Sequence, residues 1–311
     1  MNLKSYDLVI IGAGPAGLTA ALYAGRFRLN TVVLEKMNPG GQIVLSETIE
    51  NYPGFPGGIN TFDLIDKFKK QVEDVGVNIK EREVLAIKPV QENSKKLYEI
   101  ITTEGNIKTK AVIVATGASY KKLGVEGEDK FTGRGVSYCG TCDGPLFKNK
   151  DIVVVGGGDR AMEEVIYLSK YANKVFMVHR RDAFRASKIL EEKAKNNPKI
   201  NFVLNSVIEN ISGDNKVDHV VIKDVKTGEL KNISCQGVFI FVGIEPNTGY
   251  LKNLLEINEK GFIITRSGVL TSEEGVFACG DCCDKILYQV VTACGEGASA
   301  CDAAHKYLLN L

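Results

Sequence analysis

Charge of one sign and long apolar runs are both missing from this chain, and each absence excludes a class of partner. The 39 Lys and Arg residues balance 38 Asp and Glu residues, which leaves a net charge of +1 over 311 residues. A chain this balanced has no bulk attraction to nucleic acid or to an anionic membrane, so neither is an expected partner. No apolar run reaches the roughly 18 residues that a membrane-spanning helix needs.

Cysteine is scarce as well, and the N-terminus lacks a targeting pattern. Eight cysteines are too few for a disulfide scaffold in a chain of this length. Residues 1–6 are too few and too polar to be a signal peptide before the first strand-like run. We therefore expect a cytoplasmic protein. In that compartment a cysteine pair that is close in sequence indicates catalysis or metal binding.

Glycine, in contrast, is abundant and gathers in short motifs. The chain has 32 glycines, above the usual fraction of about 7%. The hydrophobic share of 44% and the charged share of 25% are ordinary for a globular protein. At roughly 150 residues per domain, the length predicts two domains.

The same order of elements occurs twice along the chain. An apolar strand at 7–11 leads into a glycine turn at 12–17, a helix at 18–27 and a strand at 31–35. An amphipathic helix with Thr61 as its N-cap is predicted at 61–76, and an apolar strand at 111–115. The later elements are predicted at 151–155 (strand), 156–161 (glycine turn), 162–171 (helix), 174–178 (strand), 187–195 (helix), 238–242 (strand), 275–278 (strand) and 290–309 (helix).

This repeat predicts an α/β protein. We expect two Rossmann-like dinucleotide-binding domains, each with three layers around a parallel central sheet, the second inserted in the first. The segment after residue 243 resembles neither copy and is expected to return to the first domain. The predicted bounds are 1–117 with 245–311 for the first domain, and 118–244 for the second.

The first glycine turn reads Gly-x-Gly-x-x-Gly at residues 12–17. Such a turn lets a pyrophosphate approach the backbone at a helix N-terminus, where amide hydrogens and the helix dipole favour negative charge. Glu35 ends the next strand, 23 residues after Gly12, where its carboxylate can accept hydrogen bonds from a ribose diol. A turn that only packs is the alternative. The surrounding strand, helix and acid favour a dinucleotide without a 2′-phosphate.

The second glycine turn, at 156–161, ends in Ala161 and is followed by a different strand end. His179 stands 23 residues after Gly156, in the place of the acid, and Arg180, Arg181 and Arg185 come with it. A carboxylate would repel a 2′-phosphate, whereas guanidinium groups bind one. A solvated basic face is the alternative. Their position at this strand end favours an NADP site.

Two Cys-x-x-Cys motifs are present. The first, Cys139 and Cys142 with Asp143 directly after it, precedes the second domain's first strand. Beside two dinucleotide sites this spacing indicates a redox pair, and Asp143 can move a proton because disulfide reduction consumes protons. The second pair is Cys279 and Cys282, and four thiolates could instead hold zinc. The two pairs are far apart in sequence and neither sits in a small knuckle, so we expect no metal.

In this arrangement the chain closely resembles the low-molecular-weight thioredoxin reductases over nearly its whole length. The order of the motifs is more specific than any one of them. The motifs lie at residues 12–17, 40–42, 50–54, 115–117, 139–143, 156–164, 179–185, 243–247 and 280–281.

The resemblance implies an NADPH-dependent flavoprotein that reduces thioredoxin. It implies a homodimer with FAD in the first domain and NADPH in the second, and hydride transfer from the nicotinamide to the flavin. Electrons would then reach the Cys139–Cys142 disulfide, with Cys142 against the flavin, Cys139 attacking thioredoxin and Asp143 as the acid. The expected cofactor-binding residues are Gly12, Gly14, Pro15, Ala16, Gly17, Glu35, Lys36, Gly41, Gln42, Asn51, Thr116, Gly117, Gly280, Asp281, Gln289 and Val290 for FAD, and Gly156, Gly158, Asp159, Ala161, His179, Arg180, Arg181 and Arg185 for NADPH.

Three positions depart from the family pattern. Gly140 stands where many members have Ala, which we take as a small change. Arg160 stands where Ser or Thr is usual, and Tyr288 where Arg is common. Arg160 could either contact a phosphate or crowd it.

Other functions compatible with the sequence are a reductase driven by ferredoxin or another flavin, the flavoprotein of a peroxidase system, and a non-enzymatic FAD-binding redox sensor. The second glycine turn and its arginines argue against the first. The peroxidase flavoprotein usually carries an additional thioredoxin-like domain, for which this length leaves no room. The intact cysteine pair argues against a sensor.

Overall fold

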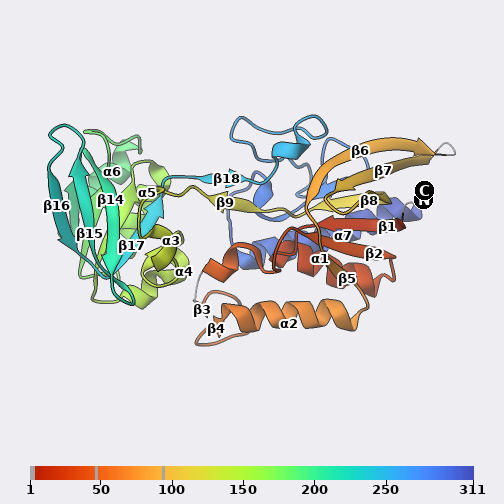
Figure 1. Cartoon of the computed structure of the whole chain (residues 1–311), viewed down its shortest axis with the longest axis horizontal. Helices are drawn as coiled ribbons and strands as arrows, with labels where there is room; N and C mark the ends of the chain where they lie inside the picture. Colours follow the sequence, from red (N-terminus) through yellow and green to blue (C-terminus); the bar gives the residue numbers. More distant parts are fainter. Residues whose placement is uncertain (1–3, 46–47, 93–94) are drawn as a thin grey trace. The chain divides into compact units, whose positions relative to one another are not determined.

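The computed structural model describes residues 4–45, 48–92 and 95–311 of the chain (Figure 1). Within them the chain divides into two compact units. Unit 1 takes residues 4–44, 52–119 and 245–311, and unit 2 takes 45–51 and 120–244.

Unit 1 is built on a mixed sheet in the order β5-β2-β1-β8-β7-β6, with β19 also paired to β8. The pairs from β5 to β8 and the β8–β19 pair are parallel, and β6, β7 and β8 pair antiparallel. The strands are β1 (Lys4–Ile11), β2 (Thr31–Glu35), β5 (Asn78–Glu81), β6 (Val84–Glu92), β7 (Lys95–Thr102), β8 (Ile107–Val114) and β19 (Val276–Ala278). Because β19 comes from the last part of the chain, residues after 245 complete the sheet that the N-terminus begins.

The continuous apolar run of β1 follows from burial on both sides of this sheet. Leu8 and Ile10 pack into the cluster that contains α1 and α7, while Val9 and Ile11 pack into the cluster on the opposite face. A strand covered on both faces reads as an unbroken apolar run rather than as an alternating one.

The helices of unit 1 include a tightly packed pair, α1 and α7, which run beside one another in Figure 1. Gly297 of α7 allows this approach, because a Cβ there would lie 2.2 Å from the carbonyl oxygen of Ala16. The helical and remaining short elements are α1 (Pro15–Arg26), η1 (Gly41–Leu45), β4 (Ile59–Asn60), α2 (Thr61–Asp74), η3 (Gly249–Leu251), η4 (Gly280–Cys282) and α7 (Val290–Leu309).

Unit 2 combines a parallel sheet with a separate antiparallel one. The parallel sheet runs β10-β17-β11-β12-β13, and β14, β15 and β16 form the antiparallel sheet. The strands are β3 (Thr48–Ile49), β10 (Val136–Ser137), β11 (Asp151–Gly156), β12 (Lys174–Val178), β13 (Ile200–Val203), β14 (Ser206–Gly213), β15 (Val217–Asp224), β16 (Leu230–Ser234) and β17 (Gly237–Phe241). The helices are α3 (Glu128–Phe131), α4 (Gly140–Asp143), η2 (Gly144–Phe147), α5 (Asp159–Leu168) and α6 (Lys188–Lys195).

Besides the short segment 45–51, the chain passes from unit 1 to unit 2 near residue 119 and returns near residue 244, and both of these crossings are extended. The outward crossing contains β9 (Ala118–Tyr120) and the return crossing contains β18 (Ile244–Pro246), and these two strands pair with one another.

The predicted α/β fold with two Rossmann-like parallel sheets is confirmed. The strands at 31–35 and 174–178 and the helix at 290–309 have the predicted bounds. Other predicted details were wrong: β1 begins at Lys4 rather than at residue 7, and β8 at Ile107 rather than at residue 111. The N-cap of α2 is Asn60, whose side-chain oxygen accepts a hydrogen bond from the Phe62 amide, rather than Thr61. Helices α1 and α5 each begin three residues earlier than predicted, directly at the glycine turn.

No helix in the described residues is both long and apolar enough to cross a membrane.

Candidate functional site

The first glycine turn joins β1 to α1, and its glycines are required by close backbone approaches. Gly12 has φ +104°, and a Cβ there would lie 2.3 Å from the Ala115 carbonyl oxygen. A Cβ on Gly17 would lie 1.8 Å from the Gly12 carbonyl oxygen. Side chains are therefore excluded from the inner side of the turn. Gly14 is the N-cap of α1 and Pro15 its first residue, a position where the missing proline N–H costs nothing.

Two other predicted segments converge on this turn. A Cβ on Gly41 would lie 3.4 Å from the Gly14 Cα, and the Gly40 amide donates to the Ala13 carbonyl at 2.8 Å. A Cβ on Gly280 would lie 2.9 Å from the Ala16 Cβ. Residues that are far apart in sequence thus form one glycine-lined surface at the start of α1.

Glu35 reaches this surface from the end of β2. Its Oε2 accepts a hydrogen bond from the Ala13 amide at 2.6 Å, and its Oε1 accepts one from the Met37 amide at 3.1 Å. A carboxylate oxygen can accept more than one hydrogen bond, so each retains capacity for a hydroxyl donor. Glu35 therefore lies at the first glycine turn, and its contact with a ribose stays a prediction.

The remaining predicted residues of unit 1 occupy varied positions. Lys36 pairs with Glu83 at the surface, 2.7 Å from its Oε1, and Thr116 donates to the Asn247 carbonyl at 2.9 Å.

Gln289 caps α7 through a capping box with Thr292, and Val290 is the first residue of that helix. Gln42 lies on η1 beside Gly41, Gly117 follows Thr116 after β8, and Asn51 lies in the segment 45–51 that belongs to unit 2.

Asp281 is held by an ion-pair network that the sequence did not indicate. Lys285 Nζ lies 3.0 Å from Asp281 Oδ1 and 3.1 Å from Glu296 Oε2, and Glu296 Oε2 also accepts the Gly280 amide at 2.7 Å. The pKa of Lys285 is raised: burial lowers it, but the Asp281 and Glu296 carboxylates outweigh burial. The same ammonium lies 5.5 Å from the ring centre of Tyr288, the residue that replaces the usual Arg. A cation is therefore present beside this loop despite the replacement.

The second glycine turn joins β11 to α5 and packs against His179. A Cβ on Gly157 would lie 2.1 Å from His179 Cε1, and a Cβ on Gly156 would lie 2.5 Å from the Ala161 Cβ. Burial lowers the pKa of His179 and outweighs the hydrogen bonds that the ring can donate to the Ala183 and Gly156 carbonyls, which raise it, so the neutral ring is favoured. His179 therefore forms a neutral wall behind the turn.

The predicted arginines are exposed around this turn. Arg180, Arg181 and Arg185 are all exposed, and within the residues that the structure describes none of their guanidinium groups has a carboxylate within ion-pair distance. The Arg185 amide donates to the Gly157 carbonyl at 2.8 Å, which ties the loop of these arginines to the turn. Asp159, the first residue of α5, accepts the Ser187 amide through its Oδ1 at 2.7 Å. Arg160 is exposed beside it.

Cys139 and Cys142 form a disulfide at the start of α4, and their Cα atoms are 5.3 Å apart. Both cysteines are half-buried, while Thr141 between them is exposed. The Cys142 amide also points at Cys139 Sγ, at 3.2 Å. The predicted redox pair is thus present and partly accessible to solvent.

Asp143 lies directly behind the disulfide and is buried. Its Oδ2 accepts a hydrogen bond from Ser137 Oγ at 2.5 Å. The same hydroxyl accepts the Cys139 amide at 3.1 Å, so Ser137 connects the carboxylate to the cysteine backbone. Ser137 was not among the residues predicted from the sequence, although it lies only two residues before Cys139.

That Gly140 is a small change from Ala stays a prediction, and the structure shows which group an added methyl would meet. A Cβ at this position would lie 2.0 Å from Glu164 Oε2, so Ala would displace that carboxyl group. No local sequence pattern predicts this contact, because Glu164 lies on α5 and Gly140 on α4, and the two meet only when the helices pack.

The second Cys-x-x-Cys has a different environment. Cys279, Cys282 and Cys283 are buried thiols, and burial is the main cause that raises the pKa of Cys279. In the part of the chain that the structure describes, no three His, Cys, Asp or Glu side chains are grouped as a metal site. Since Cys139 and Cys142 are joined to each other, the zinc interpretation has no support.

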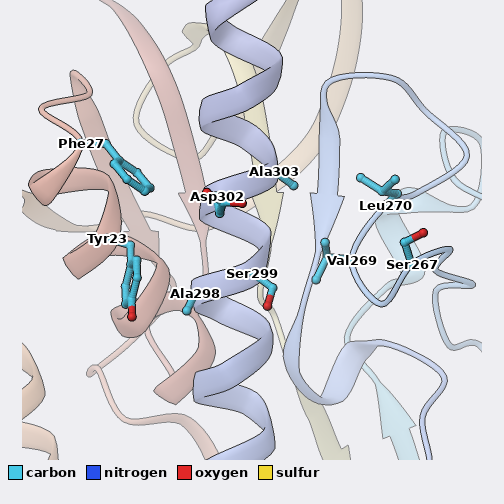
Figure 2. A pocket seen from close by; sticks show the side chains of 9 residues that line it. All are labelled: Tyr23, Phe27, Ser267, Val269, Leu270, Ala298, Ser299, Asp302 and Ala303. Carbon is cyan, nitrogen blue, oxygen red and sulfur yellow. The ribbon is translucent and has the colours of Figure 1, made fainter.

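A cavity of about 460 Å³ lies elsewhere in unit 1, between α1, α7 and the loop 267–270. Figure 2 shows Tyr23 and Phe27 on one side of α7 and Ser267 and Leu270 on the other. None of the predicted site residues lines it, and we do not assign it to the site. Its lining residues are Tyr23, Phe27, Ser267, Val269, Leu270, Ala298, Ser299, Asp302 and Ala303.

Two parallel-sheet units with one glycine turn each, and a disulfide in a Cys-x-x-Cys turn, define a disulfide oxidoreductase with two dinucleotide-binding folds. A family model described as pyridine nucleotide-disulphide oxidoreductase matches residues 6–297. The chain belongs to this family.

Individual relatives agree over almost the full length. The chain is 44% identical over 306 residues to a thioredoxin reductase of Treponema pallidum, covering 98% of each chain. It is 45% identical over 312 residues to a thioredoxin reductase of Peptoclostridium litorale, again with 98% of each covered. The crystal structure of the thioredoxin reductase from Streptococcus pyogenes matches with a TM-score of 0.93 at 43% identity, covering 100% of both chains.

Proposed function

We propose that this protein is a flavoprotein disulfide reductase that uses NADPH to reduce thioredoxin. The observation that carries the proposal is the half-buried Cys139–Cys142 disulfide. It lies in a chain that also has two glycine turns of the kind that binds a dinucleotide's pyrophosphate. The thioredoxin reductases that match over almost the whole chain support thioredoxin as the substrate.

The first turn suits FAD. Its inner surface is kept bare by Gly12, Gly14 and Gly41, so a pyrophosphate can approach the backbone at the start of α1. Glu35 would accept the ribose hydroxyls, and its negative charge disfavours a 2′-phosphate at this site. Residues 1–117 and 245–311 are proposed as the FAD domain, and the FAD-binding residues that the resemblance implies all lie within these ranges.

The second turn suits NADPH. Neutral His179 leaves no negative charge at the strand end, and the exposed guanidinium groups of Arg180, Arg181 and Arg185 are available to a 2′-phosphate. Gly158, at the N-cap of α5, has open space where a side chain would stand. Residues 118–244 are proposed as the NADPH domain.

When bound, FAD would accept a hydride from NADPH and pass two electrons to the disulfide. In this chain Cys142 is the proposed flavin-side cysteine, and Cys139 is the cysteine that attacks thioredoxin's disulfide. Asp143 is the proposed acid, because the leaving thiolate needs a proton and this carboxyl group sits one residue from Cys142. Ser137 holds that carboxyl group in place through the 2.5 Å hydrogen bond.

The test is anaerobic mixing of the FAD-loaded protein with NADPH, followed by addition of oxidised thioredoxin. Bleaching of the flavin absorbance by NADPH and its recovery with thioredoxin support the proposal. Bleaching by reduced ferredoxin but not by NADPH would establish the alternative donor. Bleaching without any disulfide substrate among a panel of thioredoxin-like proteins would leave only the redox sensor.

A homodimer and a cytoplasmic location are part of the same proposal and rest on the resemblance. Light scattering coupled to size-exclusion chromatography tests the dimer: the mass should be twice that of the 33.9 kDa chain. A mass equal to one chain would overturn it.

A further inference from the structure

The helical turn that carries the disulfide packs on α5 through two glycines. Gly140 and Gly144 are four residues apart, so they face the same side of the α4–η2 segment. A Cβ on Gly140 would lie 2.0 Å from Glu164 Oε2, and one on Gly144 would lie 2.9 Å from Leu168 Cδ2. Glu164 and Leu168 are likewise four apart on α5. The redox turn therefore rests on one face of the helix that starts at the nucleotide turn.

Glu164 is the polar member of this contact. Its Oε2 is fully buried and has no hydrogen-bond partner among the described residues. Burial of an ionised carboxylate without a partner is strongly unfavourable, whereas a neutral carboxylic acid is tolerated. Burial accordingly raises the pKa of Glu164, and it outweighs the lowering caused by Arg160.

The charged surroundings of Glu164 are few. On its own helix, Arg160 favours the ionised form, Glu163 disfavours it, and the Tyr167 hydroxyl is within electrostatic reach. From the packed α4 side, the buried carboxyl group of Asp143 is engaged by Ser137. The element against Glu164 itself, at Gly140, presents only backbone.

We propose that Glu164 is a positioning residue of the redox centre: its carboxyl group fills the space beneath Gly140 and fixes the turn that carries Cys139 and Cys142. The inference rests on the proposed function, because it takes this disulfide as the redox centre. Glu164 transfers no electrons. The ionised form of Glu164 places a negative charge beneath the turn and disfavours the thiolate of the reduced pair.

The proposal makes Gly140 and Glu164 an energetically coupled pair. A methyl group on residue 140 should disturb the turn only while the Glu164 carboxyl group occupies the same space. In contrast, residues that act independently would show additive effects.

The experiment measures the alkylation rate of Cys139 by iodoacetamide across pH in the NADPH-reduced, FAD-loaded protein, with the modified site assigned by mass spectrometry. The variants are Gly140→Ala, Glu164→Ala, the double variant and Glu164→Gln. Exposed Glu192→Gln on α6 is the matched control for a lost carboxylate. FAD content and circular dichroism establish that each variant is folded.

We expect Gly140→Ala to change the rate about 10-fold in the native background, a coupling of about 1.4 kcal/mol, and to change it little when Glu164 is Ala. Glu164→Gln, which cannot ionise, should raise the alkaline limb of the pH profile, while Glu192→Gln leaves the profile unchanged. Additive effects of Gly140→Ala and Glu164→Ala, or identical profiles for Glu164→Gln and the native protein, would overturn the proposal.

Failure of this inference and failure of the proposed function are distinguishable. The alkylation cycle reports on the cysteine turn without thioredoxin. Additive variants that still reduce thioredoxin would reject the role of Glu164 alone. If Gly140 and Glu164 are coupled but the protein does not reduce thioredoxin, thioredoxin is rejected as the substrate and the positioning role of Glu164 stands. If Gly140→Ala does not fold, the pH profile of Glu164→Gln decides.

Discussion

The two units repeat one backbone plan but differ in charge at the end of the strand that follows the glycine turn and helix. In unit 1, β1, a glycine turn, α1 and β2 end at Glu35, whose carboxylate accepts the Ala13 amide of the turn at 2.6 Å. In unit 2, the corresponding strand β12 is followed by His179, a neutral ring packed on Gly157, and then by exposed arginines. Under the proposed function, the shared plan would hold a dinucleotide in each unit, and the strand end would select which dinucleotide binds.

The two Cys-x-x-Cys motifs also share a pattern but differ in their surroundings. Spacing is identical, yet Cys139 and Cys142 of unit 2 form a half-buried disulfide, while Cys279 and Cys282 of unit 1 are buried thiols. Accessibility, which spacing does not encode, separates a redox pair from core packing.

The largest expected effect comes from breaking the contrast between the two cysteine pairs. Cys139→Ser or Cys142→Ser should abolish thioredoxin reduction, because a single thiol cannot form the disulfide that passes electrons on. Reduction of the flavin by NADPH should persist in both. Cys279→Ala is the matched control and should retain turnover. Normal turnover of either serine variant in a coupled NADPH oxidation assay would refute the mechanism.

The acid of unit 1 should matter for FAD. Glu35→Ala removes charge-assisted hydrogen bonds worth roughly 1.5–3 kcal/mol each, which corresponds to about 10- to 100-fold weaker FAD binding. Fluorescence titration of the apoprotein with FAD measures it. Glu104→Ala, at an exposed carboxylate of the same unit, is the control. An unchanged FAD affinity would show that Glu35 serves only to hold the Ala13 amide.

The arginines of unit 2 should matter for NADPH, as the acid of unit 1 should for FAD. Arg180→Ala or Arg181→Ala should lower kcat/KM for NADPH about 10- to 100-fold, mainly through KM, since one charge-assisted contact is lost. The efficiency with NADH should barely change, because NADH has no 2′-phosphate. Arg266→Ala, an exposed arginine of unit 1, is the control. Equal use of both nucleotides by the unmutated protein would sink this assignment.

The smallest effect concerns the neutral state of His179. Because its pKa is lowered in the folded protein, the unfolded chain binds the proton more readily, and stability should fall as pH drops through the ordinary histidine value of about 6.5. Between pH 7.5 and pH 5.5 the free energy of unfolding should fall less in the His179→Asn variant than in the native protein. Urea unfolding at both pH values measures this difference, and equal losses would contradict a neutral buried ring.

Local signals in the sequence predicted most of the fold. Apolar runs and glycine turns identified β2, β12 and α7 with their bounds, since those signals lie within a few residues of one another. The convergence of Gly41 and Gly280 on the first turn was anticipated only through the resemblance. No local pattern indicated Glu164 beneath Gly140 or Lys285 beside Asp281, because these contacts depend on how separate elements pack.

The most direct test of the central claim counts electrons. The FAD-loaded protein is titrated anaerobically with NADPH, and the accepted equivalents are compared with those of the Cys139→Ser, Cys142→Ser double variant. If NADPH reduces the flavin and the flavin reduces this disulfide, the native protein accepts twice the equivalents of the variant. Equal uptake by the two proteins would contradict the account.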